Sequence, residues 1–164
     1  MNLADNFGWK YVYELPFFLT KDSMLQWFQY RINHRILGTN RLMFKMGIVD
    51  KENCSFCNHF SDTILHLFWE CRYVDQFWRA LIKWLSEEFL NSFTNWSKKD
   101  IIFGNRGIQV SSNIFVLPSK RHIYRCKVRN GLPSLNLFKA ELKNYILSEK
   151  CYASTSDTMI KFTR

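Results

Sequence analysis

The sequence predicts a small, mainly α-helical domain with a zinc knuckle-like loop at its centre and a helical extension at its C-terminal end. Two observations lead to this prediction. Apolar residues recur at helical spacing on both sides of residues 48–71, most clearly over residues 74–85. Between these runs, three cysteines and a histidine gather at residues 54–71, with a spacing typical of a bound zinc ion.

The length of 164 residues fits one domain with a loosely attached tail. We expect four segments, each defined by its composition. An N-terminal strap covers residues 1–20, and a helical zinc-binding domain covers residues 21–97. A basic helical extension then covers residues 98–152. Residues 153–164 are polar and should form a frayed tail.

Helix-start and helix-stop residues divide the part of the chain before the loop. Residues 9–18 are short, aromatic and interrupted by a proline, and they predict a short helix or an extended strap. An apolar stripe over residues 25–36 predicts the next helix, which should end near Gly38. Thr39 should cap a second short helix, and Gly47 is its natural left-handed stop.

The part of the chain after the loop predicts further helices. Residues 74–85 hold apolar side chains at i, i+3, i+4 and i+7. Residues 100–104 are apolar and fit either a helix or a strand. Residues 113–128 predict a helix that Pro118 should break or kink, and Ser134 should cap the last helix.

The central loop carries the pattern C-x2-C-x8-H-x4-C, formed by Cys54, Cys57, His66 and Cys71. Two thiolates separated by two residues can chelate from one tight turn, and the other pair supplies the remaining corners of a tetrahedron. The loop has few apolar contacts of its own, and a bound ion would stabilise it by something on the order of 10 kcal/mol. Four protein ligands leave no open position for water, so we expect one structural Zn2+.

Reduced thiols and a degenerate site are the alternatives to zinc. A disulfide is disfavoured because residues 1–10 lack the features of a signal peptide, which predicts an intracellular protein of the nucleus or cytoplasm, not a secreted one. His59 is a rival fourth ligand, but it lies so close to Cys57 that their ring would be cramped. His66 and Cys71 would lie about 140° apart on a continuous helix, so we expect a kink between them, with Cys71 starting the next helix.

The chain has 23 basic and 14 acidic residues, and its net charge of +9 predicts nucleic acid as a partner ahead of a membrane surface. The longest apolar runs are too short to span a bilayer, and we expect neither a membrane nor a small-molecule substrate as a partner. The candidate nucleic-acid-binding residues are Arg31, His34 and Arg35 at helical spacing, and Lys120, Arg121, Arg125, Lys127 and Arg129 in a run without acids. The alternative for both groups is pairing with local carboxylates or simple solvation.

The sequence predicts no catalytic site. The aromatic stripe between Phe68 and Trp84 is better explained by core packing than by base stacking. The sequence contains no pair of adjacent Asp residues for a two-metal site, no phosphate-binding glycine loop and no serine nucleophile elbow. Glu141 and Lys143 match only part of a restriction-like nuclease motif. We therefore expect an accessory module and not an enzyme.

These motifs together resemble a known module. The likeness rests on the Arg-Ile-Asn-His-Arg helix at residues 25–40, Lys-Met-Gly-Ile at 45–48, the C-x2-C pair, and His-Leu-Phe-Trp-Glu-Cys at 66–71. The following Phe77-Trp78 and the segment from residues 123–127 through 138–143 add to it. Over about residues 9–150 the chain is similar to the zinc-binding region found downstream of the reverse transcriptase in LINE-type, non-LTR retrotransposon polyproteins. The combination of metal motif and preceding helix is fairly specific, whereas either half alone is weak.

The resemblance implies zinc ligation by the four motif residues and a module that grips template RNA or target DNA, largely through backbone charge. It fixes no individual nucleic-acid contact, and it makes an upstream reverse transcriptase domain a candidate partner. The chain contains no polymerase body, and Pro118 falls where a helix is needed. The alternatives are a protein-interaction or scaffolding module that docks on a polymerase domain, and a decayed fragment that does neither.

Overall fold

The computed structural model of the chain describes residues 8–88, 96–104 and 110–162, and it describes side chains in these ranges except at residues 110–112 and 152–162. Within these ranges the chain forms eight helical elements and no strand, which confirms the predicted mainly helical fold. The elements are α1 (Trp9–Leu19), α2 (Ser23–Asn33), α3 (Asn40–Lys45), the π-helical turn η1 (His66–Glu70), α4 (Arg72–Glu88), α5 (Lys98–Phe103), α6 (Val110–Val128) and α7 (Leu135–Phe162).

Side-chain caps explain where several of these helices begin. The Asp22 carboxylate accepts the N–H groups of the first turn of α2. The Thr39 hydroxyl accepts the N–H of Leu42 at 3.3 Å and starts α3, as predicted. Ser97 and Asp100 form a reciprocal capping box at α5. Each such cap satisfies backbone donors that the helix itself leaves unpaired.

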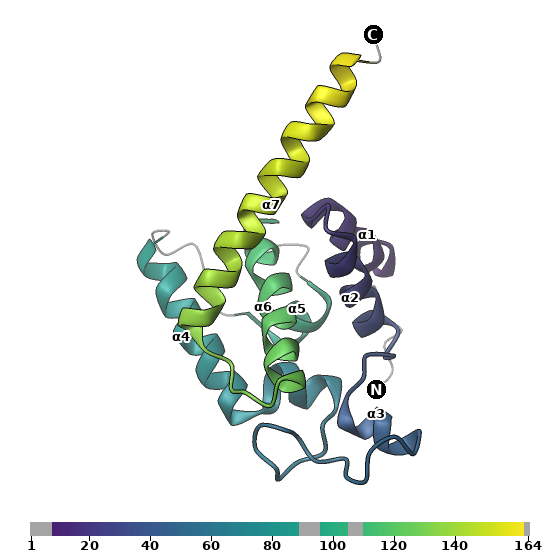
Figure 1. Cartoon of the computed structure of the whole chain (residues 1–164). Coiled ribbons are helices and arrows are strands. Elements are labelled where there is room, and N and C mark those ends of the chain that lie inside the picture. The colour runs from purple at the N-terminus through teal and green to yellow at the C-terminus, as the bar shows by residue number, and fades with distance from the viewer. Residues whose placement is uncertain (1–7, 89–95, 105–109, 163–164) are drawn as a thin grey trace.

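The helices lie in two groups on either side of α6 (Figure 1). α1 and α2 pack against each other and against α6, while α4 lies on the other side and is contacted by α7. α3 and the metal loop lie together at the end of the molecule opposite the C-terminus, and the second half of α7 extends away from the other helices (Figure 1). Glu149 on α7 accepts hydrogen bonds from the Thr20 hydroxyl and the Lys21 N–H, which ties α7 to the start of α2.

The apolar faces of α2, η1, α4, α5, α6 and α7 meet in one hydrophobic core. The rings of Phe28 and Phe68 meet edge to face with centroids 6.3 Å apart, and those of Phe77 and Phe138 do so at 5.7 Å. Trp78 Nε1 donates to the Phe68 carbonyl at 2.8 Å and so fixes η1 on α4. Because core residues come from both sides of residue 97, the two segments expected at residues 21–97 and 98–152 share one core.

The C-terminal end of α2 differs from the prediction. The helix ends at Asn33, before the predicted end, because Arg35 adopts a left-handed backbone with φ of 58°. The N–H groups of Ile36 and Leu37 then turn back to the carbonyl of Arg31, at 2.9 and 3.1 Å. This turn buries Leu37 completely and leaves Ile36 51% exposed, so Ile36 does not belong to the apolar stripe.

Two further differences concern α6 and α7. Pro118 does not end α6, which continues from Val110 to Val128, where it packs against α1, α2, η1 and α7. This packing compensates for the one backbone hydrogen bond that a proline removes. Residues 153–162, expected to be frayed, continue α7 as a helix, since extending a formed helix adds one hydrogen bond for each residue ordered. No helix within the described ranges has the length and apolar character needed to cross a bilayer.

Candidate metal centre

Cys54 and Cys57 lie on a tight turn that folds around the Cys54 sulfur. The N–H of Phe56 points at the Cys54 Sγ at 3.4 Å, and the N–H of Asn58 donates to the Cys54 carbonyl at 2.9 Å. Asn58 adopts a left-handed backbone with φ of 56°, which asparagine tolerates better than most residues. The Cys54 N–H donates to the Phe60 carbonyl at 2.8 Å and closes the turn. These bonds hold the first two candidate ligands close together.

The other two candidate ligands are joined by η1. The Thr63 hydroxyl accepts the His66 N–H at 2.9 Å and starts this turn. The Cys71 N–H donates to the His66 carbonyl at 3.0 Å, an i to i+5 bond that widens the turn and places the two residues about one turn apart. Cys71 itself is extended, with ψ of 127°, and immediately precedes α4. The predicted change of path between His66 and Cys71 is therefore present.

The four side chains converge on one buried point. The ligand atoms of Cys54, Cys57, His66 and Cys71 all lie within 4.8 Å of one another, and none of the four residues is more than 7% exposed. The Cys54 and Cys71 sulfurs are 3.9 Å apart, and the Cys57 sulfur is 3.4 Å from His66 Nε2. A tetrahedral zinc ion sets these separations at about 3.8 Å between two sulfurs and about 3.5 Å between sulfur and nitrogen. The observed spacing fits one zinc ion.

Without a metal ion, Cys54 and Cys71 share one proton between their sulfurs. A hydrogen bond to Cys71, together with burial, raises the pKa of the Cys54 thiol, and the same bond lowers the pKa of Cys71. A divalent cation displaces the shared proton, because thiolates and not thiols are the ligands. Three sulfurs and an imidazole suit zinc, and four protein ligands give it a structural role.

A buried ion pair fixes the metal loop to α3 and α6. Asp62 is 0% exposed, and its Oδ2 accepts the Asn40 N–H at 2.7 Å and lies 3.4 Å from Lys127 Nζ. Lys127 also donates to the Asn40 side-chain oxygen at 2.7 Å and the Gly38 carbonyl at 3.4 Å. Burial raises the pKa of the Asp62 carboxyl, and the Asn40 N–H and the Lys127 charge oppose that rise. The amino-acid sequence does not predict this link, because its partners are far apart in the chain and carry no local motif.

Two lysines that were predicted to contact nucleic acid are buried instead. Lys127 is 5% exposed and holds the ion pair with Asp62. Lys120 is 2% exposed, and its Nζ donates to Gln29 Oε1 at 2.5 Å and to the Ile102 carbonyl at 3.0 Å. Burial lowers the pKa of Lys120 to about 7. Neither ammonium group can reach a phosphate, so we remove Lys120 and Lys127 from the candidate nucleic-acid-binding residues.

The three arginines of the same run lie in different surroundings. Arg121 Nη1 lies 2.7 Å from Asp22 Oδ2, and this pair is only partly exposed. Arg125 lies 3.6 Å from a Glu141 oxygen, with 42% of its side chain exposed. Arg129 is exposed and pairs with no carboxylate among the described side chains. The run is therefore much less positive at the surface than its sequence suggests.

Arg31, His34 and Arg35 lie together at the C-terminal end of α2. His34 and Arg35 are exposed and Arg31 is half-buried. Neither arginine pairs with a carboxylate in the part of the chain that the structure describes. Helical spacing predicted one shared face, but Arg35 lies in the left-handed turn that follows the helix.

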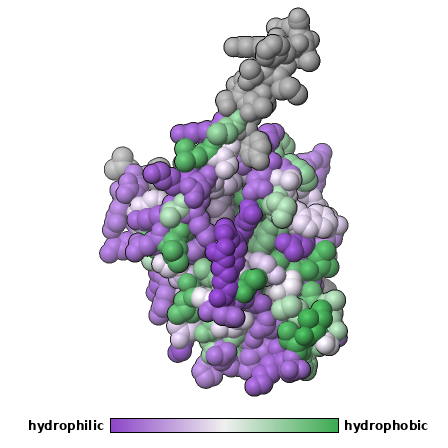
Figure 2. All heavy atoms as spheres, viewed as in Figure 1, coloured by the Kyte–Doolittle hydropathy of each residue, from purple (hydrophilic) through white to green (hydrophobic). Residues whose placement is uncertain are grey.

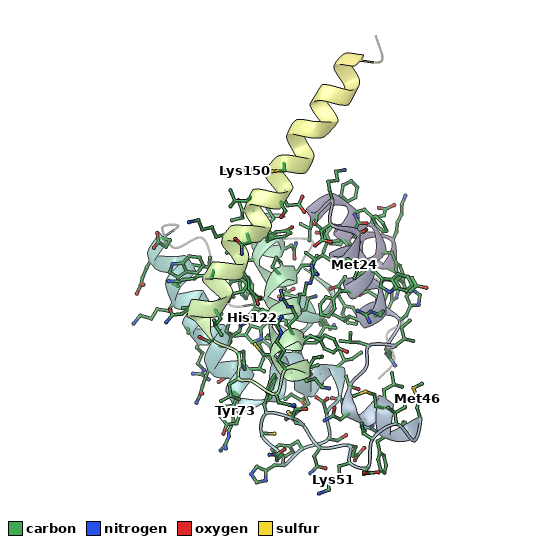
Figure 3. The ribbon with its side chains drawn as sticks, in the orientation of Figure 1. Met24, Met46, Lys51, Tyr73, His122 and Lys150 are labelled. Carbon is green, nitrogen blue, oxygen red and sulfur yellow. The ribbon has the colours of Figure 1, made fainter. Side chains whose placement is uncertain are left out.

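Two histidines, His59 and His122, lie outside the cluster. His59 is exposed and lies outside the cluster, as expected. His122 lies at the interface of α6 and α7 (Figure 3), where its Nδ1 is 3.0 Å from a Glu141 oxygen and its Nε2 accepts the Ser134 N–H at 3.3 Å. The Cys126 sulfur lies 3.6 Å from the same Nε2. Because that nitrogen already accepts a hydrogen bond, His122 is poorly placed to deprotonate the thiol.

Comparison with known proteins gives one match. Residues 3–78 match a family model described as zinc-binding in reverse transcriptase. The matched segment contains all four residues of the cluster and the elements from α1 to the first half of α4. It corresponds to an accessory metal-binding domain and not to a catalytic domain. No curated protein and no solved structure matches the chain.

Proposed function

Residues 3–78 are a zinc-binding domain of the family associated with reverse transcriptases, and from this premise we propose that the chain binds nucleic acid beside a reverse transcriptase. In this proposal the zinc ion is structural and holds the loop against the core. Exposed cations near the loop contact phosphates and give an affinity that depends little on base sequence. The observation that carries the proposal is an uncompensated positive surface on α2 and α3.

We define the α2–α3 surface by four cations at residues 23–49, a stretch without Asp or Glu, namely Arg31, Arg35, Arg41 and Lys45. All but the half-buried Arg31 are exposed. None of the four pairs with a carboxylate among the described residues. His34 is exposed beside them. A phosphate backbone supplies the complementary charge, and each contact releases counterions, so affinity should fall as salt rises.

The end of α6 supports a smaller second contact. Arg129 is exposed and Arg125 is partly exposed, and both remain in the proposal. Arg121 contributes less because Asp22 neutralises it. Since Lys120 and Lys127 are buried, the α2–α3 surface and not α6 should dominate binding.

The test is a titration of labelled RNA and DNA with the zinc-loaded full chain at several salt concentrations. The Arg31→Glu/Arg35→Glu variant should bind single strands more weakly. If both arginines contact phosphates, the slope of log affinity against log salt should become shallower by about 1.4. The matched control is Arg72→Glu/Arg79→Glu, which makes the same change of net charge on α4, on the other side of α6 (Figure 1).

The control separates a local contact from the effect of net charge. We expect Arg72→Glu/Arg79→Glu to leave the salt slope close to that of the wild type. Equal losses in the two variants would mean that net charge alone attracts the polyanion. A wild-type chain that binds neither RNA nor DNA at low salt would refute the proposal.

A second candidate function is docking on a polymerase domain, and an apolar patch favours it. Phe44, Met46, Ile48 and Phe60 are 46–66% exposed, on α3 and the metal loop. Figure 2 shows apolar side chains gathered over the α3 end of the molecule, and Figure 3 shows Met46 projecting outward there. Contiguous exposed apolar surface is typical of protein interfaces. Binding to a reverse transcriptase domain that Met46→Asp and Ile48→Asp abolish, without any nucleic-acid binding, would favour this function.

A further inference from the structure

We propose that a row of aromatic rings on α1 and α2 stacks an unpaired base of a single-stranded nucleic acid on Trp27, at the end of the row. This inference rests on the proposed nucleic-acid binding and names its substrate class. The ring row consists of Tyr13 from α1 and His34, Tyr30 and Trp27 from the α2 segment. Aromatic stacking favours single strands over duplexes, whereas the positive charge of the α2–α3 surface attracts both.

The four rings contact one another in sequence. Trp27 and Tyr30 are stacked, with centroids 4.8 Å apart and planes inclined by 8°. Tyr30 and His34 follow at 4.1 Å and 39°, and His34 and Tyr13 at 5.4 Å and 38°. Trp27 ends the row, since Tyr30 is the one described ring that contacts it. Because Trp27 is 53% exposed, its solvent-facing side can receive one more flat ring. The contacts within the row hold the other rings in place.

The ring row is exposed, although many other aromatic residues of the chain, among them its neighbour Phe28, are buried in the core. Trp27 is 53% exposed, Tyr30 40% and Tyr13 39%. Phe28, the neighbour of Trp27 on α2, is 3% exposed and packs in the core. Burying an aromatic side chain is strongly favourable, so a connected row left in water points to a partner that covers it. Stacking on such a partner recovers the same apolar area.

Charge next to the row selects nucleic acid as that partner. Arg31 lies one turn after Trp27 on α2, and Arg35 follows His34 directly. Both belong to the acid-free stretch at residues 23–49, and neither pairs with a carboxylate among the described residues. Bases against aromatic faces and phosphates against nearby arginines form the arrangement by which proteins bind single strands. An apolar protein segment would use the rings and leave both cations unpaired.

Unpaired bases fit the row better than a duplex does. In a duplex each base is already stacked on its neighbours and presents only its edges in the grooves. A single strand exposes base faces, and stacking on an aromatic side chain is worth about 1–3 kcal/mol per base. The ring row should therefore contribute to single-strand affinity and leave duplex affinity unchanged.

The test uses the zinc-loaded full chain, labelled oligo(U) and oligo(dT), and a duplex of the same length. Trp27→Ala should weaken single-strand binding by about ten- to hundredfold and leave duplex binding within about twofold. Trp27→Phe should retain affinity within a few-fold but lose the fluorescence quenching that a base stacked on Trp27 causes. The matched control is Phe18→Ala, since Phe18 is a 76% exposed aromatic residue of α1 outside the row. It should bind like the wild type.

The outcomes separate this inference from the function on which it rests. If Trp27→Ala binds single strands as tightly as the wild type while Arg31→Glu/Arg35→Glu does not, stacking is refuted and charge-based binding stands. If Trp27→Ala loses single-strand and duplex affinity equally, the rings do not select unpaired bases and the inference fails. Wild-type chain that binds neither oligonucleotide nor duplex refutes both proposals. Where Trp27→Ala does weaken single-strand binding, the relative affinities for oligo(U) and oligo(dT) identify the kind of strand.

Discussion

Removing the zinc ion should unfold the helical body of the chain and not the metal loop alone. The cluster is part of the hydrophobic core, in which Cys54, Cys71, Leu67 and Phe68 are all 0% exposed. η1, which lies between two candidate ligands, packs against α4, α5 and α6. If the ligands separate, η1 loses the anchor that holds Phe68 between these helices. The loss should therefore spread through the core.

The expected magnitude follows from the free energy of metal binding. A structural zinc contributes about 10–16 kcal/mol, whereas a folded domain is stable by only about 5–15 kcal/mol in total. For a chain of this size, 1 kcal/mol corresponds to roughly 2–4 °C in Tm. Even half of the lower figure, about 5 kcal/mol, would lower Tm by roughly 10–20 °C. The metal-free chain should accordingly show little cooperative unfolding at 37 °C.

The assay is metal content by mass spectrometry, paired with circular dichroism during heating before and after chelation. We expect about one zinc per chain, and loss of both helicity and the thermal transition when it is removed. Variants inside and outside the cluster show whether the loss of stability comes from the metal site. His66→Ala and Cys71→Ser should behave like the chelated protein, whereas His59→Ala and Cys126→Ser, outside the cluster, should behave like the wild type. A chelated chain that keeps its wild-type Tm would refute the structural role of the metal.

Two further predictions concern the buried lysines. Burial lowers the pKa of Lys120 from 10.5 to about 7, so between these values the unfolded chain binds a proton that the folded chain does not, and stability rises with pH. The measurement is the free energy of unfolding in urea, compared between the wild type and Lys120→Met at several pH values. The wild type should gain something on the order of 5 kcal/mol relative to the variant between pH 7 and pH 10.5. A difference that does not change with pH would contradict the burial of Lys120. Lys127→Ala should cost roughly 3–5 kcal/mol, because it leaves the Asp62 carboxylate buried without its cation. Asp62→Asn in the same background should restore part of that loss, and strictly additive losses in the double-mutant cycle would show that the two residues do not interact.

Much of the metal centre could be predicted because its signals are local. The C-x2-C turn, the polar loop and the helical spacing after it each lie within a few residues. Helical periodicity also implied that His66 and Cys71 could not share an ion across a straight helix. In the structure, the π-helical turn η1 brings His66 and Cys71 together, because its i to i+5 hydrogen bond widens the turn. Spacing alone therefore predicted the cluster and the need for a change of path, but not the form that it takes.

The ends of the helices were harder to predict, because neighbours far away in the sequence help to determine them. Arg35, and not Gly38, takes the left-handed conformation that ends α2, and this choice buries Leu37. Pro118 remains inside α6 because the helices around it stabilise the segment. Local propensity gave the weaker contribution at both positions, and tertiary packing outweighed it.

The amino-acid sequence by itself determined the helical class, the convergence of four metal-binding side chains and the excess of positive charge. Which of those charges reach solvent was decided only by the tertiary structure. Lys120 and Lys127 lie in the most basic run of the chain, yet both are buried. There Lys120 binds Gln29 and Lys127 pairs with Asp62, each from a distant segment. The physical reason is that a residue's charge is its own property, whereas its exposure depends on every element that packs against it.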